Sequence, residues 1–297
     1  MHWALAGVAV AILGVPWIAE ASDPFLVIPP PEVVDRSPAY RYANMDSQAA
    51  LDELDRRKIL YQRVEPHGAV RTPIRLTGKL HGVHIHSALA EHERPTTPFE
   101  ICDARLALAL DDLSALLARH DIAEVVHFTM YRPTQMRTVA SDAQSKLEPG
   151  WLVGSTLAKK SGSRKPGTKK AGRTSSGRTS TRGKKPSKPS SAPPPATSYA
   201  VQSRHPLGLA IDAGVFIKRD GSVLSVASHF HGAIGAQTCG PGASVPKEPR
   251  ARELWGIVCE TYDAKIFTYV LTPNFDQPHN DHLHMDIKPG VRWFLYH

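Results

Sequence analysis

Two short stretches near the C-terminus decide the fold: residues 203–212 read SRHPLGLAID and residues 279–284 read HNDHLH. Residues 208–218 alternate and are rich in Val, Ile and Phe, so they predict a strand. Residues two apart on a strand share a face, and the neighbours that share a face with Asp212 are small. This face therefore leaves room for an ion beside a carboxylate.

Residues 282–287 alternate in the same way and predict a second strand. Its polar residues share one face: His282, His284 and Asp286. His205 precedes the first strand, in a loop that can bend back over it. With the two strands side by side, His205, Asp212 and His284 would converge. Two imidazoles and one carboxylate are typical of the three protein ligands of catalytic Zn²⁺, whose fourth position is left to water.

These residues resemble the peptidase family that groups D-Ala-D-Ala carboxypeptidases, murein endopeptidases and hedgehog-like zinc domains. The family pattern, S-x-H-x-x-G-x-A-x-D followed by H-x-H, is complete here and in the required order. Within this family the chain is most similar to the extensin-like C-terminal group of bacterial envelope proteins. Residues 204–226 and 268–287 carry the likeness, and residues 97–132 carry it more weakly.

The resemblance implies a role for each polar residue of the pattern. It assigns the three zinc ligands to His205, Asp212 and His284. It assigns four further active-site residues: Asp281, His282, His279 and Arg132. Asp281 stands where relatives carry an acidic general base, and the two histidines match assisting imidazoles. Arg132 matches an arginine that follows a strand and binds the substrate or the developing oxyanion.

Such a site would hydrolyse an amide. Zn²⁺ lowers the pKa of a water molecule to about 7 and polarises the scissile carbonyl. Either Asp281 or His282 would take the proton of the water and pass it to the leaving amine, and the residues leave that choice open. Arg132 would stabilise the negative charge of the tetrahedral intermediate. We expect a zinc peptidase that acts on peptidoglycan stem peptides or cross-links. The alternative is a non-catalytic, zinc-containing protein that binds the cell envelope.

The N-terminus predicts export. Residues 4–18 are apolar but too few to span a membrane comfortably, and Ala19-Glu20-Ala21 fits an A-x-A cleavage site. We therefore expect a signal peptide over residues 1–21, a periplasmic or extracellular protein, and no transmembrane segment after cleavage. The first three residues lack Lys and Arg, which leaves an uncleaved anchor or a different start codon as alternatives.

The basic charge is concentrated in one segment. Residues 159–188 contain 12 Lys or Arg and no Asp or Glu, whereas the whole chain of 297 residues carries 36 Lys or Arg and 28 Asp or Glu. Residues 157–198, rich in Ser, Gly, Pro and Lys, predict a disordered insert. It is either a tolerated loop or a tether to an anionic envelope polymer, and its binding to nucleic acid would be non-specific.

The coarse pattern predicts an α+β fold, in which helices flank a small antiparallel sheet that carries the zinc site. Residues 22–95 form an N-terminal region of unknown role, and residues 96–297 form the zinc peptidase-like domain around the insert. We expect an irregular, Pro-rich segment over residues 22–46.

Three further local features are predicted. We expect a strand with exposed histidines over residues 81–86, and a helix that begins at Thr97 and ends near Arg119. Of the three cysteines, Cys239 and Cys259 are the expected disulfide in an oxidising compartment, which leaves Cys102 as a buried thiol.

Overall fold

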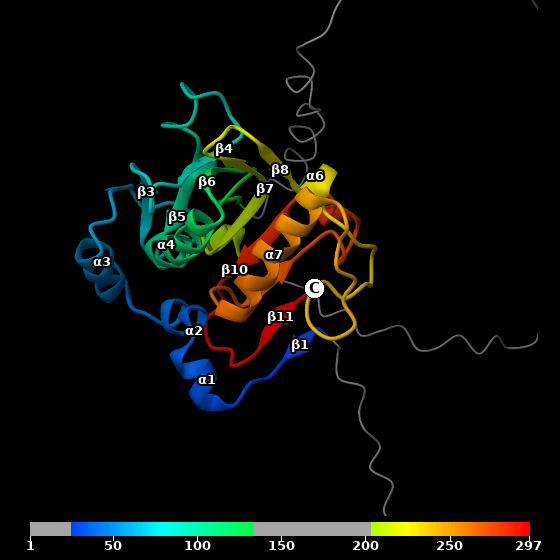
Figure 1. Cartoon of the computed structure of the whole chain (residues 1–297). Helices are drawn as coiled ribbons and strands as arrows, with labels where there is room; N and C mark the ends of the chain where they lie inside the picture. The colour runs from blue at the N-terminus through cyan, green and yellow to red at the C-terminus, as the bar shows by residue number, and fades with distance from the viewer. Residues whose placement is uncertain (1–24, 134–202) are drawn as a thin grey trace, which may run out of the picture. The chain divides into compact units, whose positions relative to one another are not determined.

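An eight-stranded sheet runs through the part of the chain that the structure, a computed structural model, describes, namely residues 25–133 and 203–297 (Figure 1). Its strands, in spatial order, are β1 (Leu26–Val27), β11 (Phe294–Tyr296), β9 (Tyr269–Leu271), β10 (Leu283–Asp286), β7 (Ala210–Lys218), β6 (Ile122–His127) and β4 (His84–Ser87), with β8 (Val223–Ser225) also paired to β7. The pairs β4–β6 and β9–β11 are parallel and the others antiparallel. The fold is α+β as predicted, but the sheet is mixed and larger than the small antiparallel one expected.

The N-terminal region contributes to the same compact unit as the C-terminal stretches. It supplies β1 and β4, which end the strand order on either side. It also supplies two strands of a second, three-stranded sheet, whose members are β2 (Tyr61–Arg63), β3 (Pro73–Leu76) and β5 (Ile101–Asp103). Local alternation cannot reveal the pairings of β1 with β11, β4 with β6 and β3 with β5, because they join segments far apart in the sequence.

Helices cover one face of the large sheet. The two longest, α4 (Ala104–Arg119) and α7 (Pro249–Ala264), contact each other over this face (Figure 1). On its outer side, α4 is covered by α2 (Pro38–Ala43) and α3 (Ser47–Arg56). A helix that is packed on all sides must be apolar all round, and α4 is buried along most of its length. The short helices α1 (Pro31–Arg36) and α6 (Val226–His229) complete the described set.

Alternation along the two central strands separates the core from the site. Ile211 and Met285 are fully buried in the same hydrophobic core as the residues of α4 and α7. Asp212 and His284, one position along, point to the opposite face of the sheet. The pattern predicted this division correctly, and it leaves the polar face free of the helical layer.

The sequence suggested an irregular segment over residues 22–46, but the described part of it, residues 25–46, contains two helices that begin at prolines. Pro31 and Pro38 occupy first helical positions, where the fixed φ of proline suits the helix and its missing N–H costs nothing. The Ser37 hydroxyl accepts a hydrogen bond from the Tyr40 amide at 3.3 Å and caps α2.

The helix expected from Thr97 begins at Ala104 instead. Thr97 and Pro98 open only a single 3₁₀ turn, after which the chain extends into β5. Asp103 then caps α4 and forms a buried ion pair with Arg105, with 2.7 Å between Oδ1 and Nε. The cap at Asp103 outcompetes the one at Thr97, because residues 101–103 pair with β3. The C-terminal end, at Arg119, is as predicted.

The strand expected over residues 81–86 is β4, but its histidines are not all exposed. His86 is buried, with Nδ1 2.9 Å from the Ser87 carbonyl oxygen and Nε2 3.4 Å from Glu124 of β6. The parallel pairing with β6 covers this side chain, which the sequence pattern could not show.

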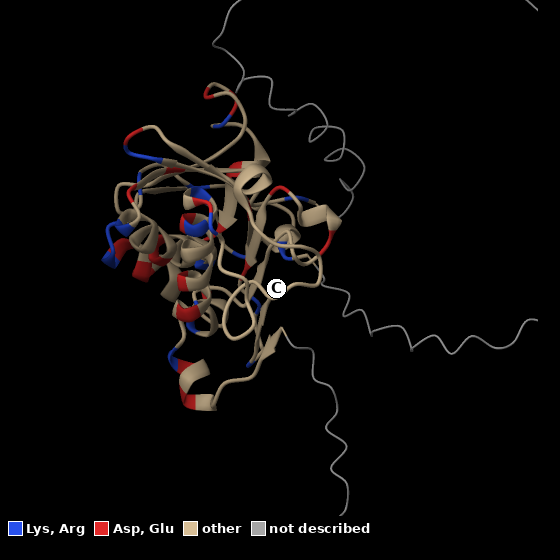
Figure 2. Cartoon of the chain, turned by 45° about the vertical axis from the view of Figure 1, so that its right-hand side comes forward, with Lys and Arg blue, Asp and Glu red and all other residues tan. Residues whose placement is uncertain are grey.

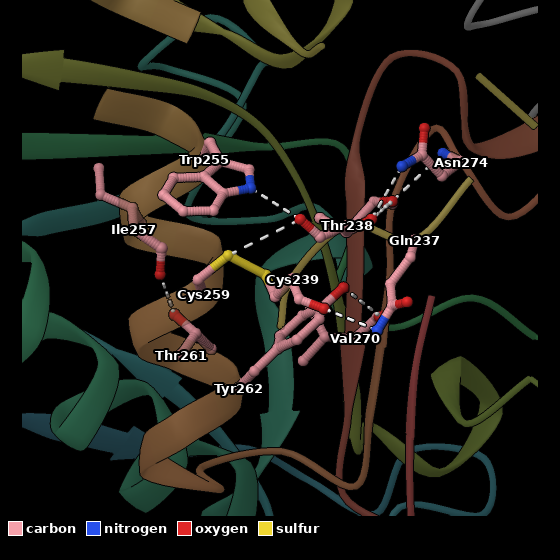
Figure 3. Close-up of a disulfide and its surroundings, with 11 residues drawn as sticks. Gln237, Thr238, Cys239, Trp255, Ile257, Cys259, Thr261, Tyr262, Val270 and Asn274 are labelled. Atoms are coloured by element: carbon pink, nitrogen blue, oxygen red, sulfur yellow. Dashed lines mark hydrogen bonds between the residues drawn. A yellow bond between two sulfur atoms is a disulfide. The ribbon is translucent and has the colours of Figure 1, made fainter. Parts of the chain in front are cut away.

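The expected disulfide joins Cys239 to Cys259 (Figure 3). Cys102 is a buried free thiol, as predicted. The disulfide fastens the loop after α6 to α7. Thr238 strengthens this connection, because its carbonyl accepts from Trp255 Nε1 at 2.7 Å and its hydroxyl accepts from Asn274 Nδ2 at 2.9 Å. The loop is thereby held against the segment that leads to His279.

Acidic and basic residues are interspersed along the described part of the chain (Figure 2). No helix among the described residues is long and apolar enough to cross a membrane. The signal peptide expected over residues 1–21 and the insert expected over residues 157–198 lie outside the described residues.

Candidate metal centre

Asp212 and His284 form the centre of the site. They are direct partners in the antiparallel pair of β7 and β10, so their side chains project from the same face. Nδ1 of His284 lies 2.9 Å from Oδ1 of Asp212, and both side chains are almost fully buried. The predicted convergence of these two residues is therefore present in the structure.

His205 completes the group from a tight turn. It begins the 3₁₀ turn η3 (His205–Leu207), and Gly208 ends that turn with a φ of 64°. A Cβ at Gly208 would lie 2.8 Å from the backbone nitrogen of Asp103, so the turn needs glycine for both its conformation and its close packing. The turn places Nε2 of His205 3.0 Å from Oδ1 of Asp212.

Each ring of His205 and His284 has one nitrogen bound by a supporting group and the other nitrogen facing Asp212. Nδ1 of His205 lies 3.2 Å from the Met130 carbonyl oxygen, and Nε2 of His284 lies 3.4 Å from Asp286. With those nitrogens as donors, the opposite nitrogens present lone pairs to the Asp212 carboxylate. One ligand atom from each of His205, Asp212 and His284 lies within 4.8 Å of the others. Three convergent electron-pair donors fit a cation.

The electrostatics of the group agree with this geometry. Burial would raise the pKa of Asp212, but the neighbouring His205, His282 and His284 hold it well below its ordinary value. Burial lowers the pKa of His205. Burial would also lower the pKa of His284, but hydrogen bonds to Asp212 and Asp286 raise it to about 9. A proton and a metal cation therefore compete for His284, because a metal ligand must be deprotonated.

His282 approaches the same carboxylate from the turn before β10. Its Nε2 lies 3.5 Å from Oδ1 of Asp212, and its Nδ1 lies 2.7 Å from Oδ1 of Asp281. Asp281 lies in the turn and not in the strand, so its carboxylate can bind the side of the His282 ring that faces away from Asp212. The ring of Phe128 meets His282 edge-on at 5.7 Å and fixes its other side.

A β-bulge makes room for that ring. The pairing of β6 with β7 shifts at Val126 and His127, opposite Gly214. A Cβ at Gly214 would lie 2.8 Å from the ring of Phe128. The bulge also changes which residues of β7 face the core, because Ala213 before it and Phe216 after it are both buried.

Arg132 and His279 lie at the edge of the group. Nη2 of Arg132 is 3.6 Å from Oδ2 of Asp212, and about a quarter of the Arg132 side chain is exposed. The ring of His279 lies 5.2 Å from that of His282 and 5.7 Å from that of His284. The structure thus brings together all seven residues that the sequence assigned to the site.

The sequence did not predict the roles of three groups that support the site histidines. Asp286 binds the far nitrogen of His284; the alternation placed it on the correct face, but no role was assigned to it. Asp276 binds Nδ1 of His279 from one turn away. The third group is the Met130 carbonyl behind His205, and a backbone contact of this kind carries no sequence signal.

Comparison with known proteins gives one match. A family model described as the extensin-like protein C-terminus matches residues 196–294, about a third of the chain. This span contains both stretches of the predicted pattern and supports the extensin-like part of the resemblance. Neither the curated proteins nor the solved structures contain a match. Arg132 lies outside the matched span.

Proposed function

We propose that the protein is an exported zinc peptidase that hydrolyses amide bonds in peptidoglycan stem peptides or cross-links. The observation that carries the proposal is the convergence of His205, Asp212 and His284, with a fourth polar side chain, His282, aimed at the same point. The substrate class is proposed from the resemblance of the two stretches to murein peptidases; the matched family model covers both stretches but names no substrate.

The donor set fits zinc better than a hard cation. Two imidazoles and one carboxylate are a common protein ligand set of catalytic Zn²⁺, whereas Ca²⁺ and Mg²⁺ prefer oxygen ligands. Met130 and Asp286 hold the two imidazoles from behind, as the outer partners of metal-binding histidines do. Bound there, Zn²⁺ would supply Lewis acidity, which activates a water molecule and polarises a carbonyl.

His282 is the stronger candidate for the general base. Its Nδ1 is engaged by Asp281, so Nε2 is the nitrogen that faces the site. In this arrangement Nε2 would accept the proton of the attacking water and return it to the leaving nitrogen as the C–N bond breaks. Asp281 would fix the tautomer and orientation of the ring, as the acidic member of a catalytic triad does.

Arg132 is placed to assist the same step. Its guanidinium lies beside Asp212, at the edge of the site, with part of the side chain open to solvent. A carbonyl oxygen that gains negative charge during attack would be stabilised by this donor. His279, whose pKa is lowered chiefly by burial, lies against both His282 and His284.

The test is digestion of purified sacculi by the zinc-loaded chain, followed by chromatography of the released muropeptides. The wild-type chain is expected to release products with new amino groups, and His282→Ala at equal zinc content is expected to release few. If the zinc-loaded wild type binds sacculi but releases nothing from any peptidoglycan type, the non-catalytic envelope-binding alternative replaces this proposal.

A further inference from the structure

A cluster of two cations and two aromatic rings adjoins the metal centre. It consists of Tyr269, Lys288 and Trp293, which contact one another, and of Arg204, whose charge acts on both Tyr269 and Lys288. Tyr269 is the cross-strand partner of Asp286, which binds His284, so the cluster begins on the same face of the sheet as the metal ligands. Arg204 immediately precedes His205 in the turn. We call these four residues the cationic subsite.

Lys288 is fixed by the two rings. Its Nζ lies 4.8 Å from the centre of the Trp293 ring and 5.6 Å from that of Tyr269, and it donates to the Tyr269 hydroxyl at 3.2 Å. The two rings meet edge-on at 5.3 Å. Such contacts hold an ammonium group in one position without neutralising it.

The two cations of the subsite outnumber the single carboxylate that acts on Lys288, that of Asp286. Burial and the charge of Arg204 lower the pKa of Lys288, while Asp286 opposes them only in part. Asp286 is turned towards His284 through Oδ2. Among the described residues, the buried Nε of Arg204 has no hydrogen-bond partner. A buried N–H of a cation without a partner is costly, which favours an acceptor supplied by a ligand.

We propose that the cationic subsite holds a carboxylate of the substrate, with Lys288 and Arg204 as its donors and the two rings as its apolar wall. This inference rests on the proposed function. Lys288 follows His284 by four residues, which is about 13 Å along an extended chain. A peptide with its scissile amide at the metal would therefore reach Lys288 within about four residues. A stem peptide offers two such carboxylates, the C-terminal one and that of its internal glutamate.

The experiment uses three acetylated stem pentapeptides, L-Ala-γ-D-Glu-L-Lys-D-Ala-D-Ala, that differ only in charge. One has both carboxylates free, one is amidated at the C-terminus, and one is amidated at the glutamate. Binding is measured by calorimetry with the full, zinc-loaded chain carrying His282→Ala, so that no peptide is consumed. The same measurement is made after adding Lys288→Met, or Lys79→Met as a control that removes an exposed lysine from the segment between β3 and β4.

We expect one of the two amidations to weaken binding about tenfold, the range of a charge-assisted hydrogen bond, and to identify the carboxylate that is held. Lys288→Met is expected to abolish this preference, and Lys79→Met to keep it. Equal binding of the three peptides, no binding of any, or an unchanged preference in Lys288→Met would overturn the proposal.

Turnover by the wild-type chain separates this inference from the proposed function. Cleavage of all three peptides at the same kcat/KM would support the peptidase and overturn the subsite. A carboxylate preference that depends on Lys288, without cleavage of any peptide, would support the subsite and contradict the peptidase.

Discussion

Asp281 and His282 are neighbours in sequence, yet they form a directed pair, in which the carboxylate binds Nδ1 of the ring at 2.7 Å and Nε2 points towards Asp212. This is possible because β10 begins at Leu283, which leaves Asp281 in a turn. In a regular strand the two side chains would point to opposite faces. The sequence left open whether Asp281 or His282 is the general base. In the structure, His282 faces the site and Asp281 orients the His282 ring.

His282→Ala is expected to lower kcat by about 10²–10⁴-fold, because it removes the group that accepts the proton. Asp281→Ala is expected to lose less, about 10–100-fold, because the ring remains but is no longer oriented. The measurement is muropeptide release by both variants at equal zinc content. The reverse ranking, with Asp281→Ala inactive and His282→Ala near wild type, would make Asp281 the base.

Gly208→Ala is expected to destabilise the fold more than the matched variant Gly221→Ala. Both glycines have positive φ, at 64° and 82°, which costs alanine about 1–2 kcal/mol. Only Gly208 also faces a backbone atom at 2.8 Å, whereas a Cβ at Gly221 would meet nothing within 4 Å. The additional overpacking is worth about 1–3 kcal/mol. Urea unfolding of the two variants measures the difference, and equal losses would show that the turn before Asp212 tolerates a side chain.

Glu100 is expected to give the fold an acid-sensitive component. Burial would raise the pKa of this carboxyl, but His127 and the Ser87 amide, which donates to it at 2.6 Å, lower it from 4.5 to about 2. Because the pKa is lower in the folded state, the stabilisation is complete above about pH 4.5 and is lost as the pH falls towards 2. It amounts to at most about 3 kcal/mol.

The variant Glu100→Gln tests this dependence. The difference in unfolding free energy between wild type and Glu100→Gln should shrink between pH 5 and pH 2.5. The exposed residue Glu91, changed to Gln, provides the matched control and should show a smaller change. A difference for Glu100→Gln that stays constant over this range would contradict the account of the buried carboxyl.

Deletion of residues 159–188 is expected to preserve zinc content and stability but to weaken binding to anionic envelope polymers. The segment carries 12 cations and no acid, so its attraction to polyanions should fall steeply with salt. Cosedimentation with sacculi at low and high salt measures it. A variant with a neutral Gly-Ser segment of equal length separates charge from length. Unchanged binding by both variants would show that the segment does not contribute to binding of anionic polymers.

The sequence predicted what depends on local periodicity. Alternation along residues 208–218 and 282–287 correctly placed Asp212 and His284 on one face and their apolar neighbours in the core. Cys239, in the loop before α7, and Cys259, within α7, were also paired correctly. These features follow from strand geometry and short separations, which a single sequence contains.

Non-local features could not be predicted in this way. The parallel pairing of β4 with β6 buries His86, and the irregular pairing at Gly214 gives Phe128 the space from which it contacts His282. Both depend on partners distant in the chain. The Met130 carbonyl that orients His205 is a backbone group, which every residue type has, so the contact cannot be predicted from the sequence.

The central claim is that His205, Asp212 and His284 bind one zinc ion. The most direct measurement is elemental analysis of the purified chain and of a double variant, His205→Ala with His284→Ala, after equal exposure to Zn²⁺ and removal of the excess. Circular dichroism confirms that both are folded. We predict about one zinc per wild-type chain, and far less than one in the double variant, because three ligands are the usual minimum for such a site. A folded double variant that keeps the full zinc content would contradict the assignment.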